Sequence, residues 1–124
     1  MRKIIAIFVS LITLNTVNAQ TFKLDSDGRD QGYVNTILGR SKKVTDALNI
    51  TGTAKGEQVM NIVANRYFEL NDIYEERDSL KKAASALTGD AKKQAQAFAE
   101  SQKDSKLYRS HFAFDADLSL FLDA

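Results

Sequence analysis

The chain has 124 residues, with 17 Lys and Arg against 16 Asp and Glu, one histidine, and no cysteine, proline or tryptophan. This length fits one small domain and excludes a large multidomain enzyme. The formal net charge of +1 gives no basic field for nucleic acid. Without cysteine there are no disulfides, thiolate metal sites or cysteine nucleophiles, and one histidine leaves little for a transition-metal site. We therefore expect no nucleic-acid partner, metal or cofactor.

The first 19 residues have the pattern of a secretory signal peptide. Arg2 and Lys3 precede the apolar run 4–14, and Ala19 ends a sequence that fits signal peptidase. The run is shorter than the roughly 20 apolar residues of a membrane span, so an uncleaved anchor helix is the weaker alternative. No cysteine follows the run for lipid attachment. We expect an exported protein, periplasmic or outside the cell, that is neither a lipoprotein nor inserted in the membrane after cleavage.

Residues 20–30 are polar and rich in aspartate, and we interpret them as a flexible leader. A calcium loop of the EF-hand type needs glycine at its sixth position and glutamate at its twelfth. Counted from Asp25, the sixth position is Asp30 and the glycine comes fourth, at Gly28. The pattern therefore does not predict calcium binding.

From residue 31 onward, apolar residues recur at steps of three and four, which predicts helices rather than strands. We expect a first helix over about 31–48, a second over about 54–87 and a third over 91–111. Thr51 or Thr53 can cap the second helix, which at about 1.5 Å per residue extends on the order of 50 Å. A helix of that length must lie against another long helix or project from the body.

The expected fold is all-α. The second and third helices form an antiparallel hairpin that turns at Gly89 and has a poorly packed tip. Asp115 can cap a short C-terminal helix that carries Leu118 and Leu122. This short helix and the first helix pack the hairpin at its base. Because the sequence ends in an apolar stretch, the domain over 31–124 either tucks its tail into the hairpin base or is incomplete at its C-terminus.

Two stretches, 62–78 and 106–122, resemble the exported bacterial family called domain of unknown function 3826 (DUF3826). The residues that carry the resemblance on the long helix are Tyr67, Leu70, Asn71, Ile73, Arg77 and Asp78. Tyr74 stands where many members have histidine. The resemblance extends from about Tyr33 onward and covers only the amino-terminal part of the family domain, which implies a truncated chain. It also implies a sugar-binding role beside polysaccharide-degrading systems of the Bacteroidota type, and no catalytic residues carry over.

The long helix also presents a stripe of polar and aromatic residues, the steps of which are four, three and four. Amide and carboxylate groups can hydrogen-bond sugar hydroxyls, an aromatic ring can stack on a pyranose, and an arginine can bind an acidic glycan. The alternative for the stripe is that its polar groups serve helix packing. The alternative for His111 is that it is a structural histidine. The candidate sugar-binding residues are Tyr67, Asn71, Tyr74, Arg77, Asp78 and His111.

No phosphate loop, nucleophile elbow or zinc motif is present, and a glycosidase would need two carboxyl groups at a defined separation across a cleft. We therefore expect no catalytic residues. The leading hypothesis is an exported, non-catalytic accessory protein of glycan utilisation that binds a polysaccharide or oligosaccharide. The alternative is a small helical periplasmic chaperone or stress protein that binds unfolded clients through apolar surface.

Overall fold

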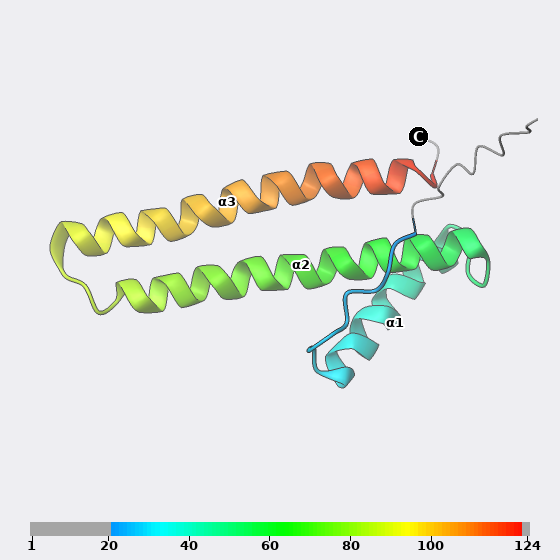
Figure 1. Cartoon of the computed structure of the whole chain (residues 1–124), viewed down its shortest axis with the longest axis horizontal. Helices are drawn as coiled ribbons and strands as arrows, with labels where there is room; N and C mark the ends of the chain where they lie inside the picture. Colours follow the sequence, from blue (N-terminus) through cyan, green and yellow to red (C-terminus); the bar gives the residue numbers. More distant parts are fainter. Residues whose placement is uncertain (1–20, 123–124) are drawn as a thin grey trace, which may run out of the picture.

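The computed structural model describes residues 21–122, which fold into three α-helices. Helix α1 (Gln31–Ala47) is followed by two helices of 31 residues each, α2 (Ala54–Ala84) and α3 (Gly89–Ser119). Helices α2 and α3 form an antiparallel hairpin, and α1 packs on α2 on the side away from α3 (Figure 1). No strand occurs in the described part, so the predicted all-α class is confirmed. The predicted signal peptide over 1–19 lies outside the described residues.

The loop between α1 and α2 is a tight connection. Asn49 and Gly52 adopt positive φ angles of 60° and 82°, which asparagine and glycine tolerate better than other residues. Thr53 caps α2, because its hydroxyl accepts a hydrogen bond from the N–H of Gly56 at 2.9 Å. A Cβ at Gly56 would lie 1.9 Å from the carbonyl oxygen of Ile50, so only glycine allows this close approach. The predicted break and the cap at Thr53 are confirmed.

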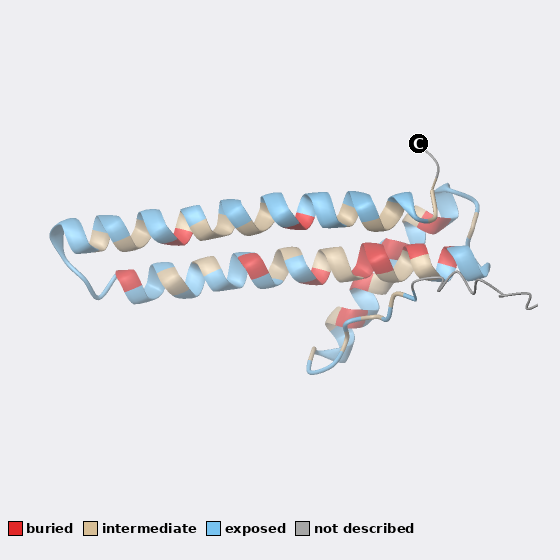
Figure 2. Ribbon diagram, turned by 45° about the horizontal axis from the view of Figure 1, so that its top comes forward, coloured by how far each residue is buried: buried red, intermediate tan, exposed pale blue. Residues whose placement is uncertain are grey.

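The hydrophobic core lies where α1 crosses α2. Figure 2 shows the buried residues concentrated around this crossing, whereas most of the hairpin is exposed. The fully buried members are Val34 and Ile37 of α1 and Ala64 and Phe68 of α2, and the partly buried residues that pack on them are Leu24, Tyr33, Leu38 and Tyr67. This crossing is the base of the molecule, and it fixes the direction in which the hairpin projects.

Small residues and polar contacts join the two helices of the hairpin. Ala84 and Ala99 are buried between them, but Leu87 and Phe98 near the tip remain 44% and 55% exposed. The polar contacts join Lys81 to Glu100 at 3.1 Å, Lys106 to Glu76, and Arg66 to Ser110. Exposed ion pairs contribute only about 0.2–1 kcal/mol each, so the tip is held weakly. This agrees with the poorly packed tip predicted from the sequence.

The prediction of a separate short C-terminal helix that begins at Asp115 is wrong, because α3 runs unbroken to Ser119. The stretch 112–117 contains no glycine or proline, so nothing interrupts the backbone hydrogen bonds of the helix. Asp115 caps nothing: its carboxylate lies 3.4 Å from Nε2 of His111, and its carbonyl accepts a hydrogen bond from the Ser119 hydroxyl. None of the helices in the described part combines the length and apolarity that a membrane crossing requires.

The apolar tail after α3 packs at the base. The ring of Phe121 meets that of Phe22 edge-on at 5.9 Å, and the N–H of Leu122 donates to the carbonyl of Leu118 at 2.8 Å. Leu120 remains 58% exposed. The part of the tail that the structure describes therefore lies against the hairpin base.

The leader lies along α2 without forming a helix or strand. The N–H of Phe22 donates to Oε1 of Gln58 at 2.7 Å, and Asn61 donates back to the carbonyl of Phe22 at 3.0 Å. The N–H of Asp25 donates to Oδ1 of Asn65 at 2.7 Å. Amide side chains of α2 thus satisfy the backbone of the segment that we interpret as a leader, and they hold it against the base.

Candidate functional site

A polar pocket of about 430 Å³ lies where the leader meets α1 and α2. The leader contributes its last turn, α1 its first turn, and α2 the middle of its length. The adjoining ends of the leader and α1 therefore meet a part of α2 that lies about 40 residues farther along the chain. The residues that line the pocket are Gly28, Arg29, Asp30, Tyr33, Asn71, Asp72 and Glu75.

Arg29 forms a fixed wall of the pocket. Its Nη1 and Nη2 donate to the two carboxylate oxygens of Asp72 at 2.8 and 2.7 Å, a bidentate arrangement. Nη2 also contacts the carboxylate of Asp25 at 3.0 Å, and Nε donates to the Asp25 carbonyl at 2.8 Å. The guanidinium carbon lies 4.6 Å from the ring centre of Phe68. Arg29 thus links the leader to α2 and to the core.

The ion pair sets the charges in the pocket. Hydrogen bonds from Arg29 lower the pKa of Asp72 below its ordinary value, against an opposing contribution from burial. Hydrogen bonding to Asp72 correspondingly raises the pKa of Arg29. Both groups are therefore charged at neutral pH, and they neutralise each other.

Other polar groups of the pocket are open to a ligand. Within residues 21–122, the half-buried amide of Asn71, the carboxylate of Glu75 and the hydroxyl of Tyr33 have no hydrogen-bond partner. Asp30 uses Oδ2 to cap α1 by accepting from the N–H of Tyr33 at 2.9 Å. The ring of Tyr33 is tilted against that of Phe68, with centres 5.6 Å apart. The pocket thus offers donors, acceptors and a positioned aromatic ring.

The residues of the predicted stripe on α2 do not all lie at the same site. Asn71 lines the pocket, whereas Tyr67 packs on the core and lines an apolar cavity of about 310 Å³ with α1 and α3. Tyr74, Arg77 and Asp78 lie farther along α2, outside the pocket. Arg77 pairs with Asp78 at 2.8 Å, and its guanidinium lies 5.1 Å from the ring centre of Tyr74. The structure therefore does not bring the last three into one site with Asn71.

His111 lies on α3, away from the stripe with which it was grouped. Its side chain is exposed, pairs with Asp115 and meets the ring of Phe112 at 5.6 Å between centres. Sequence reasoning also missed most residues of the pocket. Asp72 and Glu75 stand one and four positions after Asn71 and were within reach of a helical pattern, but Arg29 approaches from 43 residues away.

The acidic residues of the pocket do not form a metal centre. Within residues 21–122, no three His, Cys, Asp or Glu side chains converge to hold a metal ion. Because Asp72 is bound to Arg29, the carboxylates that remain free for hydrogen bonds from a ligand are those of Asp30 and Glu75. The chemistry that the pocket offers is hydrogen bonding beside an aromatic ring.

The comparison with known families gives one match. The model of the family described as protein of unknown function (DUF3826) matches residues 34–124. The chain belongs to this family. The match begins in α1 and includes all of α2 and α3, so the resemblance seen in 62–78 and 106–122 is confirmed. A search of curated proteins finds no match.

The family match covers only some of the residues that line the pocket. Asn71, Asp72 and Glu75 fall inside the matched range, whereas the leader and the first turn of α1 precede it. The family description names no ligand or activity.

Proposed function

We propose that this DUF3826 protein is an exported, non-catalytic accessory protein of glycan utilisation that binds carbohydrate in the polar pocket. The observation that carries the proposal is a set of pocket groups with no hydrogen-bond partner among residues 21–122, beside the ring of Tyr33: the amide of Asn71, the carboxylate of Glu75 and the hydroxyl of Tyr33. A sugar hydroxyl both donates and accepts, so a carboxylate accepts from one hydroxyl while an amide donates to another. An aromatic face suits the C–H groups of a pyranose.

Size and rigidity support the same ligand. A volume of about 430 Å³ lies within the range of roughly 300–1,000 Å³ that small-ligand pockets occupy. Arg29 is held by two carboxylates, and Tyr33 lies against Phe68. Walls that are already ordered reduce the entropy lost on binding.

The charge of the pocket favours a neutral sugar. The guanidinium of Arg29 is bound to Asp25 and Asp72, so it does not offer a free cation to a uronic acid. Glu75 and Asp30 add two further carboxylates at the rim. An acidic glycan would be repelled by these carboxylates, whereas neutral hydroxyls can donate to them. The acidic-glycan role considered for Arg77 is not part of this proposal.

The chaperone alternative needs broad apolar surface. The pocket is polar, and the large exposed apolar side chains of α3 form a narrow stripe along one helix. We therefore favour carbohydrate. Export is proposed on the signal peptide pattern over 1–19, which ends two residues before the part of the leader that the structure describes.

A glycan-array screen of the purified protein, followed by calorimetric titration with the best neutral oligosaccharide, tests the proposal. Asn71→Ala removes one hydrogen-bonding amide, and we expect an affinity loss of roughly 2- to 13-fold. Asp78→Ala is the matched control, because Asp78 lies on the same helix face two turns farther on and is bound to Arg77. Equal losses in both variants, or no glycan bound by the folded parent, would contradict a sugar site in this pocket.

A further inference from the structure

The outer face of α3 carries a regular stripe that the proposed function does not use. Its members recur at steps of three and four, the spacing of a helix–helix seam: Phe98, Ser101, Ser105, Tyr108 and Phe112. The three aromatic side chains are 55%, 67% and 54% exposed. The rings of Tyr108 and Phe112 meet edge-on at 4.7 Å between centres. We call these five residues the α3 stripe.

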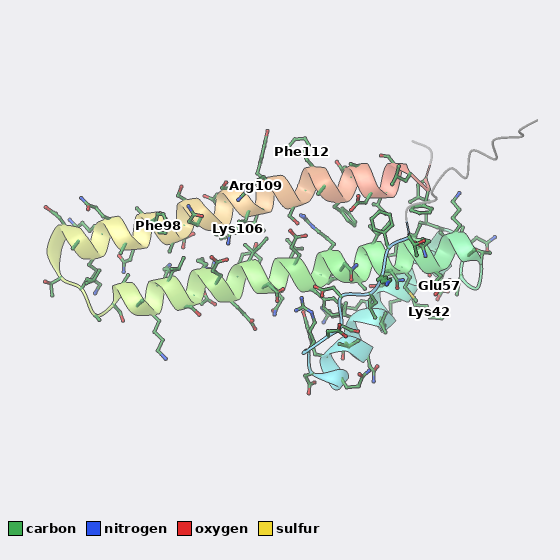
Figure 3. The ribbon with its side chains drawn as sticks, viewed as in Figure 1. Lys42, Glu57, Phe98, Lys106, Arg109 and Phe112 are labelled. Carbon is green, nitrogen blue, oxygen red and sulfur yellow. The ribbon has the colours of Figure 1, made fainter. Side chains whose placement is uncertain are left out.

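The α3 stripe faces away from the rest of the described structure. The opposite face of α3 contacts α2 through buried Ala99 and Ser110, and α1 packs on the far side of α2. Figure 3 shows Phe112 pointing away from α2. Single exposed apolar residues scattered over a surface are common, but three exposed aromatic rings on one helix face form a patch. Such patches mark interaction sites.

We propose that the α3 stripe binds the same stripe of a second copy of this chain, with the two α3 helices antiparallel. The argument is complementarity of size. With a two-fold axis near Lys106 and Leu107, Tyr108 of one copy lies opposite Ser105 of the other, and Phe112 lies opposite Ser101. The rings of Tyr108 and Phe112 then fill the space above small residues, as knobs fill holes in helix packing, and Phe98 lies opposite Asp115 of the other copy. A parallel pair would place rings on rings and serines on serines.

Polar groups along the edges of the stripe agree with this register. Asp104 and His111 flank the α3 stripe on the same side, and both are exposed. In the antiparallel register, His111 of each copy lies opposite Asp104 of the other. A slip of seven residues, about two helical turns, that places Phe98 opposite Tyr108 would instead set Asp104 against Asp104 of the other copy, which like-charge repulsion disfavours. The pattern thus favours one register.

The available area predicts a weak and reversible dimer. If a buried aromatic side chain contributes about 150–250 Å², the exposed parts of three rings from each copy bury roughly 500–900 Å² in total. With the serines and the charged edges, the interface approaches the lower limit of about 1,200 Å² for specific pairs. We therefore expect dissociation constants in the micromolar range.

Sedimentation equilibrium of the purified protein at about 1–200 µM tests the dimer. We expect a concentration-dependent monomer–dimer equilibrium that the Y108S/F112S double variant weakens at least tenfold. Tyr74→Ser is the matched control, because Tyr74 is a 41% exposed tyrosine on α2, outside the stripe, and its loss leaves the equilibrium unchanged. A parent protein that stays monomeric at 200 µM would overturn the proposal, whether or not it binds another protein. A dimer that the Y108S/F112S variant does not weaken would overturn it as well.

The register is tested by charge exchange and by cross-linking. His111→Glu weakens the dimer by about two- to fivefold, and adding Asp104→Lys restores it. Because the chain has no cysteine, S105C mixed with Y108C reports the register directly. We expect a disulfide in the mixture and little in either variant alone, with S79C on α2 as the unreactive control. Cross-linking of S105C to itself in preference to Y108C would exclude the antiparallel register.

Discussion

The base and the hairpin tip of this molecule are stabilised in different ways. At the base, Phe68 and Val59 are 0% exposed, and α1, α2 and the leader surround the core. Toward the tip, two helices meet through alanines and a few ion pairs, and Phe98 stays 55% exposed. Both regions are equally helical, so helix formation alone does not determine where the stability lies.

The difference also shows where a ligand site can lie. Because the apolar core at the base supplies the stability, Asn71 and Glu75 are left free for hydrogen bonds to a ligand. Toward the tip, charged side chains such as Lys81 and Glu100 hold the hairpin together and are bound to each other. We therefore propose the polar pocket at the base for a specific ligand and the surface of the hairpin for a second copy of the chain.

The largest contrast is expected from removing one ring from each region. Phe68→Ala leaves a cavity in the core, and we expect the free energy of unfolding to fall by about 3–5 kcal/mol. Phe98→Ala removes a ring that is 55% exposed, and we expect a change within about 0.5 kcal/mol. Urea unfolding followed by circular dichroism measures both. Similar losses in the two variants would mean that the tip is packed as firmly as the base.

The next effect concerns the guanidinium that links the leader to α2. Arg29→Met keeps much of the apolar stem but breaks the bidentate pair with Asp72, and we expect a loss of about 1 kcal/mol because the carboxylate is half exposed. Hydrogen exchange in residues 21–30 should accelerate at the same time. Arg29→Lys keeps the charge without the fork and should restore only part of the stability. A leader that exchanges equally slowly in Arg29→Met would show that Arg29 does not hold it.

Two carboxyl groups should respond to acid in opposite directions. The pKa of Asp72 is lowered by Arg29, so its contribution to stability is present above the unfolded value of about 3.9 and is lost as pH falls through the folded pKa. The pKa of Asp117 is raised by burial and by Glu69, so this group destabilises the fold above its folded pKa and the penalty disappears in acid.

Melting temperatures between pH 2 and 7 separate the two groups. We expect Asp72→Asn to lower the melting temperature at pH 7 and to remove part of its fall in acid. Asp117→Asn should raise the melting temperature slightly at pH 7 and have no benefit at pH 2. If Asp72→Asn melts like the parent at pH 7, the Arg29 pair contributes nothing to stability.

The smallest effect is expected from an ion pair of the hairpin. Lys81→Ala breaks the 3.1 Å contact with Glu100, but Glu100 keeps Lys103 at 2.7 Å. We expect the melting temperature to change by no more than about 2 °C, and less at high salt. A scanning fluorimetry series from 0.05 to 1 M NaCl measures this. A large loss that salt does not reduce would indicate packing by the Lys81 stem rather than an ion pair.

Much of the fold could be predicted from local patterns. Steps of three and four gave the three helices, and the Asn49–Gly52 break and the Thr53 cap depend on residues next to one another in the sequence. The error at Asp115 has a local cause as well. An aspartate before an apolar group is a plausible cap, but only a residue that interrupts the helix makes a cap necessary, and α3 has none there.

The pocket was much less accessible to prediction. The helical stripe pointed to Asn71, but the leader was interpreted as flexible, and its arginine meets Asp72 from 43 positions away. One usable signal was present. Polar residues at 58, 61, 65 and 72 form a second stripe along the long helix, and a polar stripe on a helix that must pack indicates a polar segment lying against it.

The central claim is that a neutral sugar binds in the polar pocket at the base and not along the hairpin. Backbone amide chemical shifts of the labelled protein, recorded during titration with the neutral oligosaccharide that the array selects, test it most directly. We predict saturable shifts confined to residues 28–33 and 71–75, with residues 85–115 unchanged. Saturable shifts along 74–78 or on α3, with the amides of 28–33 and 71–75 unmoved, would contradict the account.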